Sequence, residues 1–221
     1  MRRDRPVILI TGFGPFPGAP RNASSLLAES VAEAGKHRLP GFALHAATLP
    51  TEWRAGPSHL TTLLEELKPA VALHFGISRR ARGFVVETRA RNKMQYALDA
   101  CGESPVGDCI AEGSPAEILV TLPTGPMVER LRRMGLPVQL SRDAGGYLCN
   151  SILYHSLDHA RRSAGDSLGP RRGFVHIPDR LLGEARGESR RAAVSRLDWN
   201  GALEGGQAIL AICAGIGERA G

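Results

Sequence analysis

A cysteine near the middle of the chain lies where its thiol could become reactive. The stretch Ser141–Asn150 runs from an expected strand end through Gly145 and Gly146 into an expected helix, whose first turn contains Cys149. Unpaired N–H groups and the helix dipole put partial positive charge at a first turn, which favours the nucleophilic thiolate. The paired glycines permit a tight turn and leave room for a substrate carbonyl. The alternative is a small buried apolar residue, the commoner fate of a free cysteine.

Two other residues could serve a cysteine nucleophile as its base and as the group that orients the base. His176 lies near the end of the apolar run Gly173–Pro178, and Glu87 directly follows another apolar run. An unpaired buried charge is costly, so Glu87 either has a partner or lies at the mouth of a site. The alternatives are a hydrogen-bonded core histidine and a salt bridge between Glu87 and a neighbouring arginine.

The glycine-rich loop after the first expected strand indicates a pocket and not a nucleotide site. In Gly12–Gly18 the third glycine of a dinucleotide fingerprint would fall on Pro17, so we expect no cofactor there. Phe13 and Phe16 could wall a small apolar pocket, because ligands of open α/β sheets bind outside the carboxyl ends of the strands. The alternative is that both rings pack in the core.

The elements that must position these residues alternate between strands and helices. Apolar runs predict strands at 7–11, 42–49, 71–76, 83–86, 118–122, 138–140 and 173–178, and helical spacing predicts helices at 24–36, 60–67, 124–134, 148–162 and 202–216. The strand at 118–122 is expected to be buried, and 93–116 and 179–196 are expected to be loops. This order predicts a three-layer αβα fold with a mostly parallel, twisted central sheet. A length of 221 residues suits one such domain, so 1–221 is expected to be a single α/β domain.

Composition indicates a soluble cytoplasmic protein. Hydrophobic residues make up 43% of the chain and charged residues 23%, which is ordinary globular usage. No apolar run approaches the roughly 20 residues of a membrane span, and we see no signal peptide. The four cysteines therefore predict free thiols in a reducing compartment and not a disulfide framework.

Two competing classes of function rest on weaker patterns. The net charge of +6 is scattered in arginine doublets without an aromatic stacking platform, so we expect no nucleic-acid partner. His155 and His159 have the i, i+4 spacing of two zinc ligands, but Cys149 would lie about 120° around the helix from His155. No third ligand is evident, so no metal is expected. A metal-dependent hydrolase and a non-catalytic basic binding module stay as the alternatives.

Taken together, the motifs resemble those of the pyroglutamyl peptidase I family, the C15 cysteine peptidases. They occur in family order and span nearly the whole chain: Thr11–Phe16, Glu87 with Ala90 and Asn92 behind it, Ser141–Asn150 and Gly173–Pro178. The resemblance implies a peptidase that removes N-terminal pyroglutamate from peptides through a thioester, without metal or cofactor. It implies Cys149 as nucleophile, His176 as base and then acid, and Glu87 as the orienting group. It also implies a pocket for the pyroglutamyl ring at Phe13, Gly14, Phe16 and Asn22.

The chain departs from the family pattern at three places. Asn22-Ala23-Ser24 stands where members commonly have Asn-Pro-Ser, and Leu98–Gly102 stands where they commonly have Pro-Asp-Asn-x-Gly. Ala97 occupies a position at which some members carry a basic residue. These changes leave the three catalytic candidates in place but bear on substrate range and rate. The resemblance also implies that the chain could assemble as a homotetramer, although the sequence itself shows no interface.

Overall fold

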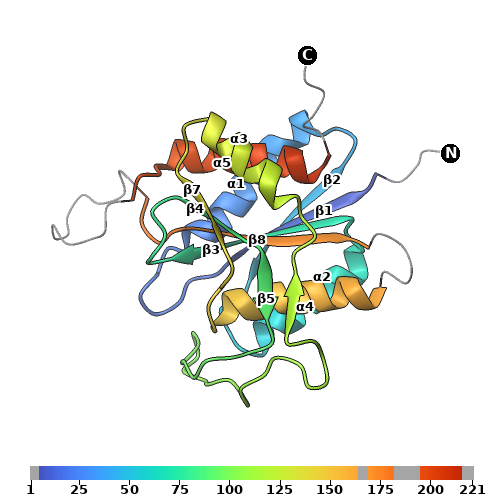
Figure 1. Cartoon of the computed structure of the whole chain (residues 1–221), viewed down its shortest axis with the longest axis vertical. Coiled ribbons are helices and arrows are strands. Elements are labelled where there is room, and N and C mark those ends of the chain that lie inside the picture. Colours follow the sequence, from blue (N-terminus) through green and yellow to red (C-terminus); the bar gives the residue numbers. More distant parts are fainter. Residues whose placement is uncertain (1–4, 164–168, 182–194, 216–221) are drawn as a thin grey trace.

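The computed structural model describes residues 5–163, 169–181 and 195–215. Its centre is a six-stranded sheet in the order β2-β1-β3-β8-β4-β7 (Figure 1). These strands are β1 (Val7–Phe13), β2 (Ala43–Leu49), β3 (Val71–Ser78), β4 (Phe84–Glu87), β7 (Val138–Ser141) and β8 (Arg171–Pro178). Every neighbouring pair is parallel except β4 with β8. The prediction of a mostly parallel sheet is confirmed.

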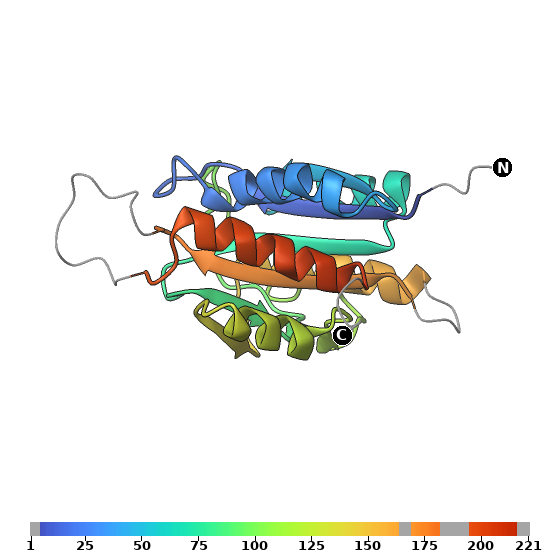
Figure 2. The ribbon, with the colours of Figure 1, turned by 90° about the horizontal axis from the view of Figure 1, so that it is seen from above.

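Helices cover both faces of this sheet. On one face lie α1 (Ala23–Arg38), α3 (Thr124–Arg133) and α5 (Trp199–Cys213), and on the other lie α2 (Ala55–Leu67) and α4 (Leu148–Ser163) (Figures 1 and 2). Each face has its own apolar cluster between helices and sheet. The three-layer αβα prediction is therefore confirmed, with helix bounds shifted by a few residues; α2, for example, begins five residues before the expected 60.

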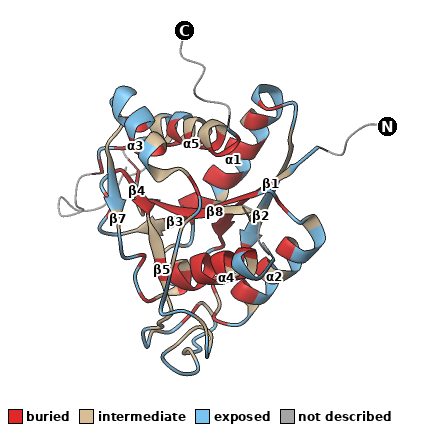
Figure 3. Cartoon of the chain, turned by 45° about the vertical axis from the view of Figure 1, so that its right-hand side comes forward, coloured by how far each residue is buried: buried red, intermediate tan, exposed pale blue. Residues whose placement is uncertain are grey.

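The two strands at the middle of the sheet are buried along most of their length. The continuous apolar runs of β3 and β8 are typical of parallel strands covered on both sides. Their parallel register places His74 beside Phe174 and Gly76 beside His176. Helix α4 is also largely buried, because it packs on the main sheet, on α2 and on a separate two-stranded sheet (Figure 3). Residues on β3, β8 and α4 therefore meet in the interior.

The predicted buried strand at 118–122 is wrong. The structure instead has β5 (Arg89–Arg91) and β6 (Glu117–Leu119), which pair antiparallel outside the main sheet. Ile118 packs against the cluster beneath α4, whereas Leu119 is 60% exposed. A short apolar run does not reveal whether a strand is buried on one face or on both, and this strand is buried on one.

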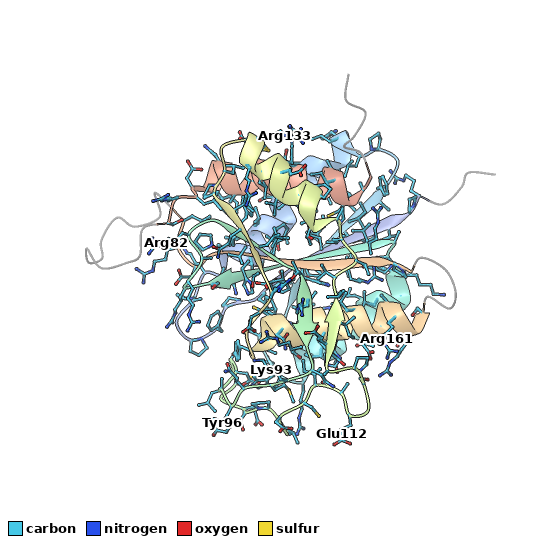
Figure 4. All side chains as sticks on the ribbon, in the orientation of Figure 1. Arg82, Lys93, Tyr96, Glu112, Arg133 and Arg161 are labelled. Atoms are coloured by element: carbon cyan, nitrogen blue, oxygen red, sulfur yellow. The ribbon has the colours of Figure 1, made fainter. Side chains whose placement is uncertain are left out.

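Residues 93–116 contain no helix or strand, as predicted, but hydrogen bonds hold their backbone in place. Asn92 donates from Nδ2 to the Ala111 carbonyl at 2.7 Å and accepts the Ile110 N–H at 2.8 Å. The buried Asp99 carboxylate accepts N–H groups from Trp53, Cys101 and Glu103, each at 2.9 Å. The tip of this loop projects away from the sheet, with Tyr96 and Glu112 at its outer end (Figure 4).

Two further expectations concern the rest of the chain. The loop expected at 179–196 lies mostly outside the described residues. None of the helices in the described part of the chain is long and apolar enough to cross a membrane.

Candidate active site

The candidate residues gather at the carboxyl ends of the central strands. The chain passes from β1 to β2 on one side and then returns to β3 on the other side of β1, so the strand order reverses between β1 and β3. Ligands of open α/β sheets bind outside the strand ends at such a reversal. Phe13 ends β1, Gly76 lies two residues before the end of β3, and His176 lies two residues before the end of β8.

The structure brings Cys149, His176 and Glu87 together. Nδ1 of His176 donates to Oε1 of Glu87 across 2.9 Å, and both side chains are buried. The Cys149 sulfur interacts with the same imidazole. Within the described residues, Glu87 pairs with this histidine and not with an arginine. The arrangement is that of a cysteine, a base and a carboxylate that orients the base.

The charges of these three groups depend on one another. Burial lowers the pKa of His176, but the negative sulfur of Cys149 and the Glu87 carboxylate outweigh it and raise that pKa from 6.5 to about 10. Oε2 of Glu87 is buried and has no hydrogen-bond partner among the described residues. Among the described residues Glu87 therefore pairs with His176 through Oε1 alone, and a positively charged imidazolium stabilises negative charge on the neighbouring sulfur.

The turn before Cys149 explains how the sulfur reaches this position. Gly145 has φ +88°, a conformation that residues with a Cβ rarely adopt. A Cβ on Gly146 would lie 2.4 Å from Cγ of Gln95, so a larger residue there would displace the Gln95 side chain. Asn150 then fixes the helix start by bonding to the N–H and C=O of Arg91 in β5. Cys149 is the second residue of α4, which confirms its predicted place in a first turn.

A hollow of about 400 Å³ lies near these groups. Tyr147, two residues before Cys149, and Phe16, from the loop after β1, both line it. The other lining residues are Pro17, Ala97, Leu98, Asp99, Ala100 and Gly102. Cys149 and His176 do not line it, so the hollow flanks the catalytic candidates and does not contain them. Phe13 is only 3% exposed and packs in the core, with its ring 6.3 Å from that of Phe174.

Asn22 and Gly14 shape the loop that carries Phe16. Asn22 is the N-cap of α1: its Oδ1 accepts the Ser24 N–H at 3.1 Å, and its Nδ2 donates to the Gly14 carbonyl at the same distance. The Gly14 carbonyl also accepts the Thr51 hydroxyl at 2.9 Å, and its N–H donates to Leu49. The polar groups of Asn22 and Gly14, which were predicted to bind substrate, thus form hydrogen bonds within the protein.

The opposite wall of the hollow is fixed by aromatic side chains. Tyr147 donates its hydroxyl to the Leu98 carbonyl at 3.2 Å, and Trp53 donates Nε1 to the Ala97 carbonyl at 2.8 Å. The two rings also meet edge to face, 5.2 Å apart. Burial is the main reason that the pKa of Tyr147 rises to about 12, so its hydroxyl keeps its proton.

Sequence reasoning missed a buried polar chain beneath the site. Nδ1 of His74 lies 2.8 Å from the Thr11 hydroxyl, and its Nε2 lies 2.8 Å from the Ser156 hydroxyl. These contacts join β1, β3 and α4, and Ser156 follows Cys149 by about two helical turns on one face of α4. Complete burial lowers the pKa of His74 to about 3, so the ring stays neutral. A histidine within the apolar run 71–76 was the available signal.

We predict that His74 makes the protein sensitive to acid. Its folded pKa lies below the ordinary 6.5, so the unfolded state binds the extra proton and stability falls as pH drops from about 6.5 towards 3. Between pH 7 and pH 5, the free energy of unfolding should fall by about 2 kcal/mol more in the wild type than in His74→Gln. Urea denaturation at both pH values measures this. The exposed-site control His37→Gln should follow the wild type, and equal slopes in wild type and His74→Gln would refute the assignment.

The paired histidines of α4 do not assemble a metal site with other described residues. Both His155 and His159 are half-buried rather than solvated, and burial lowers the pKa of each. Asp158, between them, forms ion pairs with Arg161 at 2.8 Å and Arg162 at 2.7 Å. Among the described residues, no group of three or more His, Cys, Asp or Glu side chains could hold a metal ion.

The family model and the relatives that the chain matches are pyroglutamyl peptidases, also called pyrrolidone-carboxylate peptidases. Residues 6–189 match the family model described as pyroglutamyl peptidase. The chain is 34% identical over 172 residues to the pyrrolidone-carboxylate peptidase of Gloeobacter violaceus, which covers 77% of this chain and 80% of that protein. It is also 34% identical over 175 residues to the protein of that name from Deinococcus radiodurans, covering 78% of each.

Two solved structures have the same fold. Pyrrolidone carboxyl peptidase from Thermococcus litoralis superposes with a TM-score of 0.82 at 23% identity, covering 95% of this chain and 94% of that chain. Pyroglutamyl peptidase I from Bacillus amyloliquefaciens gives a TM-score of 0.78 at 25% identity, covering 95% and 97%. The prediction of the family from the sequence motifs is confirmed.

Proposed function

This chain belongs to the pyroglutamyl peptidase family, and we propose that it is a cysteine peptidase that removes N-terminal pyroglutamate from peptides. The contact of the His176 imidazole with both the Cys149 sulfur and the Glu87 carboxylate carries this proposal. A base held by a carboxylate on one side and a sulfur on the other is the arrangement that generates and maintains a thiolate nucleophile.

The reaction then proceeds through an acyl-enzyme. The Cys149 thiolate attacks the carbonyl carbon that joins pyroglutamate to the next residue, and the negative oxygen faces the N–H groups of the first turn of α4. The tetrahedral intermediate collapses as His176 gives its proton to the leaving amine, which leaves a thioester on Cys149. His176 then takes a proton from water, which attacks the thioester and releases pyroglutamate. No step requires a metal or cofactor.

The hollow beside the triad supplies a site for the substrate ring. We propose that Phe16 and Tyr147 contact the flat lactam, while Phe13 supports this wall from the core. Asn22 and Gly14 contribute by holding the loop that carries Phe16. An apolar wall suits a neutral lactam, whose N–H and C=O can pair with backbone groups at the rim. It does not suit a charged N-terminus, because an unpaired ammonium costs several kcal/mol.

The substrate range tests this proposal. We expect kcat/KM for a pyroglutamyl amide to exceed that for the matching prolyl and glutaminyl amides by at least about a thousandfold, since several kcal/mol of lost stabilisation corresponds to that factor. Proline has nearly the same ring shape but carries a charged amine and lacks the lactam carbonyl. The measurement uses three amides with one chromogenic leaving group, and comparable values for all three would rule out the proposed activity.

Three broader features complete the proposal. We infer that residues 1–221 form one peptidase domain and that the protein acts in the cytoplasm. All four cysteines are free thiols in this structure, which is in keeping with a reducing compartment. From the family resemblance we propose a homotetramer, and light scattering of the purified protein measures this directly.

A further inference from the structure

The backbone of β3 passes unusually close to the catalytic sulfur. A Cβ built on Gly76 would lie 3.0 Å from Sγ of Cys149 and 2.6 Å from Cζ of Phe174. Real Cβ atoms are essentially never found at 2.6 Å, so glycine is required here. The Cys149 sulfur and the edge of the Phe174 ring therefore both lie against the Cα of Gly76, in the space that a side chain at this position would occupy.

The same phenylalanine also touches the base. Phe174 and His176 are two residues apart on β8, so their side chains point to the same face of the sheet. Their ring centroids are 4.8 Å apart with an interplanar angle of 51°. Phe174 is 1% exposed and is packed from behind by Phe13 and His74, at 6.3 and 6.4 Å between ring centroids. The ring has little freedom to move away from the imidazole.

We propose that Phe174, seated on Gly76, is a positioning residue that sets where the His176 imidazole lies relative to the Cys149 sulfur. The ring fills the space that the imidazole would otherwise enter, and it keeps water from one side of the ion pair. Displacing a reacting group by about 1 Å costs about a hundredfold in rate, so small changes in this packing should be visible in the chemistry. The proposed function is needed here only for the hydrolysis assay, since the reactivity of Cys149 can be measured without substrate.

The first experiment compares Phe174→Leu with Phe84→Leu. Phe84 is equally buried, but it packs in the apolar cluster on the opposite face of the sheet. Iodoacetamide alkylation of Cys149 is followed by mass spectrometry from pH 5 to pH 10, with the exposed Cys101 of the same molecule as the internal reference. Glu87 on β4 is hydrogen-bonded to His176, Tyr147 interacts with Cys149, and His74 on β3 packs against Phe174. None of these titratable groups is changed in either variant.

We expect Phe174→Leu to lower the Cys149 to Cys101 alkylation ratio at neutral pH by at least about tenfold and to lower kcat on a pyroglutamyl amide by about a hundredfold, with KM changed much less. Phe84→Leu should leave the ratio at its wild-type value even if it lowers the melting temperature. If the two variants behave alike, or if both stay within about twofold of the wild type, Phe174 does not position the pair. Phe174→Met, which conserves more volume, replaces the leucine variant if that variant does not fold.

The second experiment asks whether Gly76 and Phe174 act through one contact. Gly76→Ala should lower the alkylation ratio, because its methyl group pushes the ring and the sulfur apart. In Gly76→Ala/Phe174→Leu the smaller leucine leaves space for that methyl group, so the double variant should lose less than the product of the two single effects. Gly206→Ala is the control, since its Cβ would lie 2.6 Å from Val31 in the opposite cluster.

Each outcome of the second experiment has a definite meaning. Multiplicative losses in the double variant, or a loss in Gly206→Ala as large as in Gly76→Ala, would overturn the proposal. If Gly76→Ala does not fold, the comparison of Phe174→Leu with Phe84→Leu decides alone. If the wild type does not hydrolyse pyroglutamyl amides while the alkylation pattern is as expected, the proposed function fails and the positioning role stands.

Discussion

Cys149→Ser is expected to lower kcat on a pyroglutamyl amide to below about a hundredth of the wild-type value, because losing one member of a group that acts as a unit removes most of its contribution. A serine hydroxyl is nearly the same size as the thiol, but it does not form a stable anion beside the His176 imidazolium. Since Cys149 is only half-buried, the melting temperature should change little. Steady-state kinetics and a thermal melt together measure both effects.

Two other cysteines provide matched controls for this substitution. Cys101 is exposed and Cys109 is partly exposed, and both belong to the loop 93–116. Cys101→Ser and Cys109→Ser should retain wild-type kcat. Cys213 is a poorer control, because it is fully buried and a serine there places a hydroxyl in the core. Retention of more than about a hundredth of the wild-type kcat in Cys149→Ser would mean that another group is the nucleophile.

The sequence was sufficient to predict the layers of the fold because parallel strands buried on both faces leave a strong pattern. The runs 7–11, 71–76 and 173–178 are apolar without alternation, and each lies within a central strand of the sheet. The same reasoning failed at 118–122, where a similar run forms part of the separate two-stranded sheet that packs on α4. Composition alone could not separate these cases, because they differ in which strand the run pairs with in the folded protein.

The candidate site was predictable where chemistry requires particular residue types. A thiol at a helix start, a histidine at a strand end and a carboxylate after an apolar run were recognisable one by one. The residues that hold these three groups in place were not recognisable, because their contacts depend on the register between strands that are distant in the sequence. His74 and Ser156 are 82 residues apart, and nothing near either residue predicts their hydrogen bond. The requirement for glycine at position 76 likewise comes from the side chains of α4 and β8.

The second large effect is expected for Glu87→Gln. The carboxylate accepts a hydrogen bond from Nδ1 of His176, and with the Cys149 sulfur it raises the pKa of His176 to about 10 against the opposing effect of burial. A glutamine has the same shape but no charge, and its NH₂ group can donate to Nδ1 and favour the wrong tautomer. We therefore expect kcat to fall by at least about a hundredfold, because the imidazolium is no longer stabilised.

The pH dependence separates this role from a purely structural one. Removal of a group that raises the pKa of His176 lets burial lower it, so the alkaline limb of the kcat/KM profile should move to lower pH in Glu87→Gln. Cys149 alkylation, which needs no substrate, should slow in the pH range where the variant has lost the imidazolium and the wild type has kept it, because the positive ring stabilises negative charge on the sulfur. Glu117→Gln, which removes an exposed carboxylate paired with Arg89, is the control and should leave both profiles unchanged. A Glu87→Gln variant with the wild-type alkaline limb and wild-type kcat would show that Glu87 only fills space beside the histidine. A lower melting temperature with an unshifted profile would lead to the same conclusion, because a loss of packing weakens the fold without altering which proton His176 holds.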